Sequence, residues 1–343
     1  MDFTLSEEQL MFAETARTLF ADTVTPDHWR RLMEAGESRD AARWQAIVDT
    51  GLTALLLPER AGGLGLAELD FALIAEAAGY VALPDPLVES AGIAAPMLAA
   101  LAPDHPALAD PAATIAIEER EGAPVADADS AAAIILRRGD EAFVAAPADV
   151  RLARRESIDP FRRLFAVEWD ASSATALGTA DWELARDRGA LFAAAQGLGL
   201  AQRAVDLAVA YAQDRQQFGK PIGSYQAVKH QLSTAQVGIE FARPVVLAAA
   251  ADIAKADVHA RARISHAKIV ALETADLAAR TAIQVHGAMG YSWEVDVHLF
   301  LKRALALTGS WGTPGFHRAR VAARLFGQPT GPEFTFARDF HHA

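Results

Sequence analysis

Four long alanine-rich stretches fill the second half of this chain and constrain its fold more than any other feature. Apolar residues recur in them at helical spacing, as Leu191, Ala194, Leu198 and Val205 do in the first stretch. Glycine and proline end helices, and such turns lie at 219–221 and 287–290. We therefore expect helices over about 186–214, 224–257, 260–286 and 294–326. Together they predict a four-helix bundle over residues 181–343.

The rest of the chain predicts a helical region followed by a small β region. Ser6 is placed to cap a first helix, and further helical runs follow at 41–50, 69–80 and 87–101, all within residues 1–110. Short apolar bursts then occur at 114–117, 132–136, 142–146 and 164–169, separated by Gly, Pro and Asp as strands are. Residues 111–180 are therefore expected to form a small β-domain, in a fold that is otherwise mainly α.

Charge and cysteine content exclude several classes of function. The formal net charge is −12 without a long basic run, which argues against binding to the phosphates of nucleic acids. The chain has no cysteine, so it has no disulfide, thiol nucleophile or thiolate metal site. Acidic residues stand near Met1 where a signal peptide needs basic ones, and no apolar run is long enough to span a membrane. We expect a cytoplasmic protein without a metal site, and we interpret His341 and His342 as part of a solvated tail.

Residues 214–222 carry the most informative motif, Asp-Arg-Gln-Gln-Phe-Gly-Lys-Pro-Ile, at the end of the first long helix. Arg215 presents a planar fork of donors that fits phosphate oxygens, although a basic residue at an ordinary helix end would look the same. The motif resembles R-x-x-F-G of the acyl-CoA dehydrogenase family. Gln284 opens a second motif, Q-V-H-G-A-M-G, which is similar to the family's turn Q-x-x-G-G-x-G. The start of the chain and the loop at 58–65 resemble the family's N-terminal domain.

This resemblance implies a helical N-terminal domain, a shortened β-barrel-like middle domain and a C-terminal four-helix bundle. It also implies FAD as the cofactor, bound mainly by a neighbouring subunit. The first motif would then lie against the flavin pyrophosphate and the second against the adenosine half. The residues implied in cofactor binding are Arg215, Phe218, Gln226, Gln284, Val285, His286, Gly287, Ala288, Gly290 and Thr313, with Ala288 in place of a family glycine.

The positions that would serve a flavin of this chain's own depart from the family pattern. The family uses a glutamate to take the α-proton of an acyl-CoA thioester, and its usual position here is Trp311, which has no proton-accepting group. The alternative position for this base falls at or beside Gly189 and Ala190. Residues 117–122, Ile-Glu-Glu-Arg-Glu-Gly, stand where the family has small, rigid residues near the isoalloxazine ring. No catalytic residue is therefore assigned to this chain.

Several polar residues near these motifs receive a structural interpretation. Asp187 and Glu183 are interpreted as solvated acids at a helix start. Arg303 is predicted to be structural, pairing across helices. The arginines of 159–163 could meet phosphates of CoA, but we favour a solvated β-edge. As residues on packed helices, His230 and His286 are expected to be satisfied core histidines.

Together these differences lead to a hypothesis based on the resemblance. The chain is expected to be the β, non-catalytic subunit of an α2β2 acyl-CoA dehydrogenase of the kind that oxidises steroid side-chain CoA esters. It would complete the flavin site of a catalytic partner subunit, with an acyl-CoA as substrate and an electron-transfer flavoprotein as acceptor. Two alternatives remain open: a homomeric enzyme with Asp187 or Glu183 as a displaced base, and a flavin-free scaffold.

Overall fold

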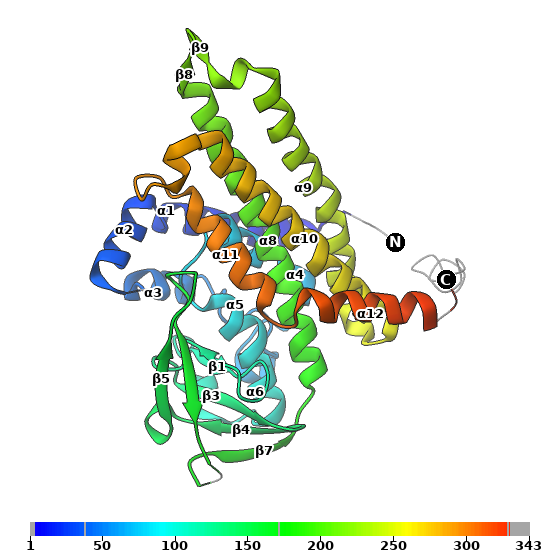
Figure 1. The fold of residues 1–343 in the computed structure, drawn as a ribbon. Helices are drawn as coiled ribbons and strands as arrows, with labels where there is room; N and C mark the ends of the chain where they lie inside the picture. The colour runs from blue at the N-terminus through cyan, green and yellow to red at the C-terminus, as the bar shows by residue number, and fades with distance from the viewer. Residues whose placement is uncertain (1–3, 38, 171, 328, 330–343) are drawn as a thin grey trace.

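The computed structural model describes residues 4–37, 39–170, 172–327 and 329. Figure 1 shows a bundle of long helices, with a small β region below it and shorter N-terminal helices beside it. The fold predicted from the sequence, mainly α with one small β region, is confirmed. No helix among the described residues has both the length and the apolar character that crossing a membrane requires.

Short helices build the N-terminal region, and their starts follow from local sequence. Ser6 forms the expected cap, since its side chain accepts from the backbone of Gln9 while the Gln9 side chain accepts from the backbone of Ser6. The second helix was not expected from the sequence, although Thr25 caps it and Pro26 occupies its first turn. The helices of this region are α1 (Glu7–Thr23), α2 (Pro26–Ala35), α3 (Ala41–Asp49), η1 (Glu59–Ala61), α4 (Glu68–Tyr80), α5 (Leu87–Glu89), η2 (Ser90–Ala94), α6 (Ala95–Leu101) and α7 (Pro106–Ala109).

The β region consists of two small sheets. One sheet has the order β1-β3-β4-β7, in which β1 and β3 are parallel and the other neighbours antiparallel, and the other has the antiparallel order β2-β6-β5. The sequence did not predict β2, β5 and β7, because they are short or carry exposed polar residues rather than an apolar burst. The strands are β1 (Ile115–Ile117), β2 (Val125–Ala126), β3 (Ala133–Arg138), β4 (Glu141–Ala145), β5 (Arg151–Arg155), β6 (Leu164–Glu168) and β7 (Thr175–Thr179), with η3 (Pro147–Asp149) between β4 and β5.

The C-terminal bundle contains the expected long helices, with one correction. The helix expected over about 294–326 is two helices, α11 (Val297–Gly309) and α12 (Pro314–Gly327). The chain breaks between them because Trp311 and Gly312 adopt positive φ values of 52° and 103°, and Pro314 then opens the next helix. The other bundle elements are α8 (Trp182–Asp214), the hairpin β8 (Gln216–Gln217) and β9 (Lys220–Pro221), η4 (Ile222–Ser224), α9 (Gln226–Asp252), η5 (Ile253–Lys255), α10 (Val258–His286) and η6 (Gly287–Tyr291).

The helix α8 lies at the centre of the molecule. It packs against α4 on one side and against α10 on another, and the stripe of Leu191, Ala194, Leu198 and Val205 is buried as the sequence predicted. One apolar core runs from the N-terminal helices through the first sheet into the bundle, while a smaller core fills the space between the two sheets. Burial of this continuous apolar surface holds the three regions together.

A buried ion pair joins the bundle to the β region. Arg303 of α11 pairs with Asp159, which is 2% exposed, and donates a hydrogen bond to the Leu83 carbonyl at 2.9 Å. Arg303 is therefore structural as predicted, but its partner lies in the β region rather than on another helix. The prediction of a solvated β-edge at 159–163 is wrong: Arg162 donates to the Ala306 carbonyl at 3.4 Å, and Arg163 pairs with Asp129.

Candidate flavin half-site and a closed second site

The R-x-x-F-G motif lies at the tip of an arm that extends from the bundle. Figure 1 shows the arm as the end of α8, the β8–β9 hairpin and the start of α9. The turn between the two strands places Phe218 and Gly219 at φ values of 54° and 79°, as the two central residues of a tight hairpin require. Positive φ is strained for a bulky residue such as Phe218, and its side chain is 93% exposed. A strained backbone that presents an uncovered aromatic ring is typical of a binding surface.

Arg215 stands at the base of this hairpin with its guanidinium in solvent. Its backbone N–H donates to the Tyr211 carbonyl at 2.8 Å, which continues the helical hydrogen bonding by one residue. The side chain is exposed, and within the described part of the chain it forms no ion pair. Gln226, in the first turn of α9, is exposed as well. A phosphate approaching this arm would meet a cation that is not paired with any carboxylate of the described residues.

The second motif forms the turn that follows α10. Gly287 has φ 60° and ψ −136°, a conformation open essentially to glycine alone. Gln284, Gly287 and Ala288 are exposed, whereas Val285 and Gly290 are buried. An exposed glycine turn next to a glutamine can bring backbone and side-chain polar groups close to a ligand. Val285 can contribute to such a site only through its backbone.

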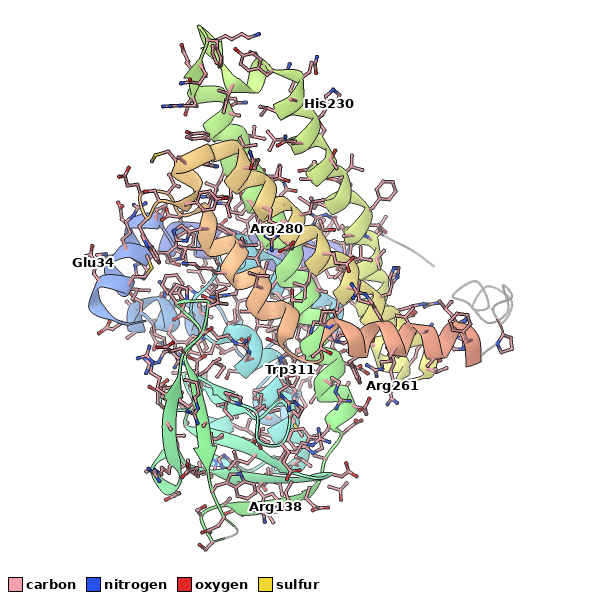
Figure 2. The ribbon with its side chains drawn as sticks, in the orientation of Figure 1. Glu34, Arg138, His230, Arg261, Arg280 and Trp311 are labelled. Carbon is pink, nitrogen blue, oxygen red and sulfur yellow. The ribbon has the colours of Figure 1, made fainter. Side chains whose placement is uncertain are left out.

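The two motifs meet in space through an aromatic contact. The ring of Tyr211, in the last turn of α8, stacks on the ring of His286, the last residue of α10, with centroids 4.2 Å apart and planes at 22°. His286 is buried and hydrogen-bonded, as predicted for a core histidine. His230 is exposed instead, on the outer side of α9 near the arm (Figure 2), so its prediction as a core residue is wrong.

Thr313 does not belong to this cluster. It lies beyond the far end of α11, which is about 20 Å long for its 13 residues. Its hydroxyl accepts from the Phe316 N–H at 3.2 Å and so caps α12. The structure thus brings nine of the ten residues expected to bind the cofactor to one end of the bundle and leaves Thr313 near the loop that contains Trp311. Cofactor binding by all ten stays a prediction.

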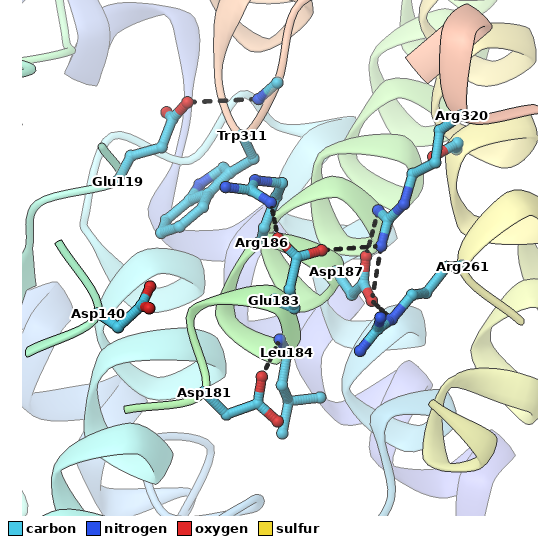
Figure 3. A network of polar contacts seen from close by, with 12 residues as sticks. Glu119, Asp140, Asp181, Glu183, Leu184, Arg186, Asp187, Arg261, Trp311 and Arg320 are labelled. Atoms are coloured by element: carbon cyan, nitrogen blue, oxygen red, sulfur yellow. Dashed lines mark hydrogen bonds and ion pairs between the residues drawn. The ribbon is translucent and has the colours of Figure 1, made fainter. Parts of the chain in front are cut away.

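The loop at Trp311 contains the position at which the resemblance predicts a catalytic base. Trp311 is 6% exposed, and its indole lies directly on Gly189 of α8. A Cβ atom built on Gly189 would fall 2.1 Å from Cδ2 of this indole, so only glycine fits there. The two positions considered for the base therefore touch each other, and the tryptophan ring lies against the Gly189 backbone. Figure 3 shows Trp311 beside Glu119 and Arg186.

Buried polar groups hold the Trp311 loop in this position. Lys268 of α10 donates to the Ser310 carbonyl and to the Gly312 carbonyl at 2.9 Å. His317 Nε2 lies 3.0 Å from the Trp311 carbonyl, which can only accept, so Nδ1 accepts from the Ser265 hydroxyl. Burial lowers the pKa of Lys268 to about 7 and the pKa of His317 to about 4, which leaves His317 neutral at physiological pH.

The acids at 118 and 119 are used for internal hydrogen bonds. The buried Glu118 carboxylate accepts from the backbone N–H groups of Gly122 at 2.7 Å and Arg137 at 2.8 Å. Burial raises the pKa of Glu118, and these two hydrogen bonds oppose that shift. Glu119 accepts from the Gly312 N–H at 3.3 Å and so ties the first sheet to the Trp311 loop. These groups stabilise the closed arrangement rather than forming an open site.

Asp187 is not the solvated acid that the sequence suggested. It is 3% exposed, and its two oxygens lie 2.6 Å from Arg320 Nη1 and 3.7 Å from Arg261 Nε (Figure 3). Burial raises the pKa of Asp187, and the hydrogen bond from Arg320 opposes that shift. Glu183 is more exposed but also pairs, with Arg186 and with Arg320 at 3.3 Å. The earlier interpretation failed because α12 carries Arg320 back onto the start of α8, which local sequence does not reveal.

Lys268, His317 and Tyr211 were not singled out from the sequence. Tyr211 could have been found, because it stands four residues before Arg215 and therefore on the same face of α8. Lys268 and His317 carried no such signal, since their partners lie on other elements. The described residues contain no group of three or more His, Cys, Asp or Glu side chains that could hold a metal ion.

Sequence comparison identifies relatives of this chain among known proteins. Two family models match it: "Acyl-CoA dehydrogenase, N-terminal domain" over residues 6–104 and "Acyl-CoA dehydrogenase, C-terminal domain" over residues 177–326. The acyl-CoA dehydrogenase IpdE2 of Mycobacterium tuberculosis is 35% identical over 311 residues, which cover 88% of this chain and 92% of that protein.

Solved structures share the fold over nearly the whole chain. A chain of the ChsE4–ChsE5 complex from Mycobacterium tuberculosis has a TM-score of 0.82 at 23% identity, covering 96% of this chain and all of that one. A chain of the Tcur3481–Tcur3483 steroid ACAD has a TM-score of 0.81 at 24% identity, covering 94% of this chain and 99% of that one.

Proposed function

The chain belongs to the acyl-CoA dehydrogenase family, and from this premise we propose that it is the non-catalytic subunit of a heteromeric acyl-CoA dehydrogenase. It completes the flavin site of a partner subunit that supplies the catalytic base. The single observation that carries this proposal is the indole of Trp311 lying on Gly189. Neither position considered for the base holds a proton acceptor, and the space between them is filled.

The residues of the arm fit a flavin bound chiefly by another chain. FAD carries a pyrophosphate, and the exposed Arg215 guanidinium is suited to bind it with paired hydrogen bonds. Phe218 offers an uncovered ring, and the Gly287 turn lets backbone approach the adenosine half. All of these groups face outward, as they must if the ligand is held by a neighbouring subunit.

This chain's own residues do not fit a second flavin or a second acyl chain. Glu118 and Glu119 use their carboxylates within the protein, and Trp311 covers Gly189. Where the three regions meet, the cavity lined by Asp85, Asp127 and Arg303 has a charged lining that does not suit an acyl chain.

The proposed roles of this chain and of the partner subunit follow from these two sites. FAD, when bound, supplies the acceptor for the β-hydrogen of the acyl-CoA thioester, which is how the family oxidises its substrates. Arg215, Gln226 and the Gln284 turn hold and orient the cofactor, and the partner contributes the proton acceptor. An electron-transfer flavoprotein would accept the electrons that the oxidation of the acyl-CoA releases.

The relatives support a heteromer and a bulky substrate. One structural neighbour is a complex of two named components, and the other is described as a steroid ACAD. We therefore propose a steroid side-chain CoA ester as the substrate and an α2β2 assembly. A homomeric enzyme using Asp187 is less well supported, because both oxygens of that carboxylate already face arginines.

Visible absorbance tests the proposal. The chain purified alone should be colourless, and the chain purified with the product of its neighbouring gene should contain about one flavin per heterodimer. Arg215→Ala should lower flavin affinity of the complex about tenfold or more, because it removes charge-assisted hydrogen bonds to phosphate. The variant chain should remain folded by circular dichroism. A yellow protein from the chain alone that is bleached by an acyl-CoA would contradict the proposal.

A further inference from the structure

We infer that Tyr211 and His286 act as a positioning pair that fixes the distance between the two parts of the flavin half-site. The inference rests on the proposed function. It adds Tyr211 to the half-site and gives His286, already expected to bind the cofactor, a positioning role, and neither residue needs to touch the pyrophosphate. Their rings come from different long helices and stack with centroids 4.2 Å apart. Each ring is connected directly to one of the two motifs.

Tyr211 is connected to Arg215 through the backbone. Its carbonyl accepts the Arg215 N–H at 2.8 Å, and Arg215 is the residue at which α8 ends. The next hydrogen bond of the arm runs from the Ile222 N–H to the Arg215 carbonyl at 2.8 Å, so the base of the hairpin is anchored at one residue. A shift of the Tyr211 ring therefore moves the end of α8 and the arm that starts there.

His286 is connected to the second motif in the same direct way. Its Nδ1 lies 2.7 Å from the Ala282 carbonyl, which only accepts, so Nδ1 carries a proton and the ring plane is fixed against α10. Gly287 follows immediately in its glycine-only conformation. Burial lowers the pKa of His286, so the ring is neutral at physiological pH and stacks as an uncharged aromatic group. The plane of this ring thus sets the starting direction of the Gln284 turn.

The stack of Tyr211 on His286 sets the direction of the arm relative to the direction of the Gln284 turn. FAD is an extended ligand, and its pyrophosphate and adenosine would be held by residues on opposite sides of this contact. A ligand of that kind gains affinity when its contact points are held at the correct separation before it binds. A branched aliphatic side chain could fill the volume at 211 but could not fix the angle between two planar rings.

Four variants of the complex with its catalytic partner test the inference, with FAD itself as the probe. Tyr211→Leu should weaken FAD binding about tenfold, and Tyr211→Phe, which keeps the ring, should bind FAD as the wild type does. His286→Leu should cause the same loss as Tyr211→Leu, and the double variant should lose little more, because either change removes the whole stack. FAD release is followed by flavin fluorescence, and unfolding of the same samples by circular dichroism.

Phe143→Leu is the matched control. Phe143 also packs against an aromatic ring, Trp169 at 5.0 Å, is likewise partly buried, and lies in the β region away from the arm. It should lower the thermal midpoint of the complex about as much as Tyr211→Leu does and leave FAD affinity unchanged. Equal losses of FAD in Tyr211→Leu and Phe143→Leu would show a general stability effect and overturn the inference.

Arg215→Ala separates this inference from the proposed function. If Arg215→Ala releases FAD while Tyr211→Leu and His286→Leu bind it normally, the half-site stands and the positioning pair is refuted. If Arg215→Ala itself retains FAD, the proposed half-site is wrong, and the pair has no cofactor to position.

Discussion

At the scale of single residues, the packing of Trp311 on Gly189 is the observation that carries the proposed non-catalytic role. A buried indole can lie on a helix only where the helix has no Cβ in its path, so the two residues depend on each other. The closed loop is then secured by Lys268 and His317, whose hydrogen bonds satisfy its buried carbonyls. The position at which the family resemblance predicts a base is thus part of a packed core.

Gly189→Ala tests the packing at Trp311. The added methyl group would lie 2.1 Å from the indole, so we expect a loss of about 1–3 kcal/mol in the free energy of unfolding, measured with urea. Gly238→Ala is the control, since a Cβ in that helix meets only the Thr274 side chain, with Cγ2 at 3.4 Å and Oγ1 at 3.7 Å, and should raise stability by about 0.5–1 kcal/mol. Equal stability of Gly189→Ala and wild type would contradict the packing described.

Lys268 should make the stability of this chain depend on pH. Its folded pKa of about 7 lies below the ordinary value of 10.5, so the unfolded chain binds more protons between these values. The cost of burying the charged amine is therefore complete below about pH 7 and is relieved as pH rises. The free energy of unfolding of wild type minus that of Lys268→Met should increase from pH 7 to pH 9 in urea titrations. A difference that is constant or falls over this range would refute the shift.

At the scale of elements, two short breaks in helical structure create the exposed arm and the packed Trp311 loop. The β8–β9 turn reverses the chain between α8 and α9 and exposes Phe218, while the Trp311 loop divides the last helical stretch and packs Trp311 on Gly189. Both breaks place a bulky aromatic residue at positive φ, which costs free energy that other contacts must offset. Around Trp311 those contacts are the buried hydrogen bonds, whereas Phe218 is almost wholly exposed and lacks them.

Phe218→Asn tests whether the strained backbone at Phe218 lacks contacts that offset its cost. Asparagine tolerates positive φ, so the variant should be more stable than wild type by up to about 1 kcal/mol in thermal or urea unfolding. The complex should at the same time hold flavin less tightly, because the exposed ring is gone. Gly219→Ala serves as the opposite control, since its φ of 79° should make alanine destabilising. A loss of stability in Phe218→Asn would show that the ring is held by contacts within this chain.

At the scale of the whole molecule, one buried arginine connects the three regions. Arg303 joins α11 to Asp159 in the segment before β6 and to the Leu83 carbonyl of the N-terminal region. Arg43 of α3 and Asp85 form a second pair at 2.5 Å within the N-terminal region, with both side chains almost completely buried. A buried pair stabilises little relative to an apolar pair of the same shape, but removal of one partner leaves an uncompensated charge. The Arg303–Asp159 pair therefore contributes to how the bundle and the β region assemble.

Asp159→Ala should lower the free energy of unfolding by about 3–5 kcal/mol, because it leaves Arg303 buried without its partner. Arg151→Ala is the comparison, since its pair with Glu168 at 3.3 Å is 79% and 66% exposed and should be worth at most about 1 kcal/mol. Both variants are measured by urea unfolding at neutral pH. Similar small losses in the two variants would mean that solvent reaches Arg303 once Asp159 is removed.

The sequence by itself determined most of the long helices, the existence of the β region and the two motifs, because periodicity, caps and glycine turns are local. It also placed Trp311 where a glutamate was expected. It did not predict α2 or the break between α11 and α12. It could not show that α12 brings Arg320 onto Asp187, that Asp159 meets Arg303, or that Tyr211 meets His286. Each of these contacts joins segments distant in sequence, so local patterns cannot reveal it. Only the tertiary structure therefore decided that Arg215 and Phe218 are exposed to solvent and that Trp311 is packed on Gly189.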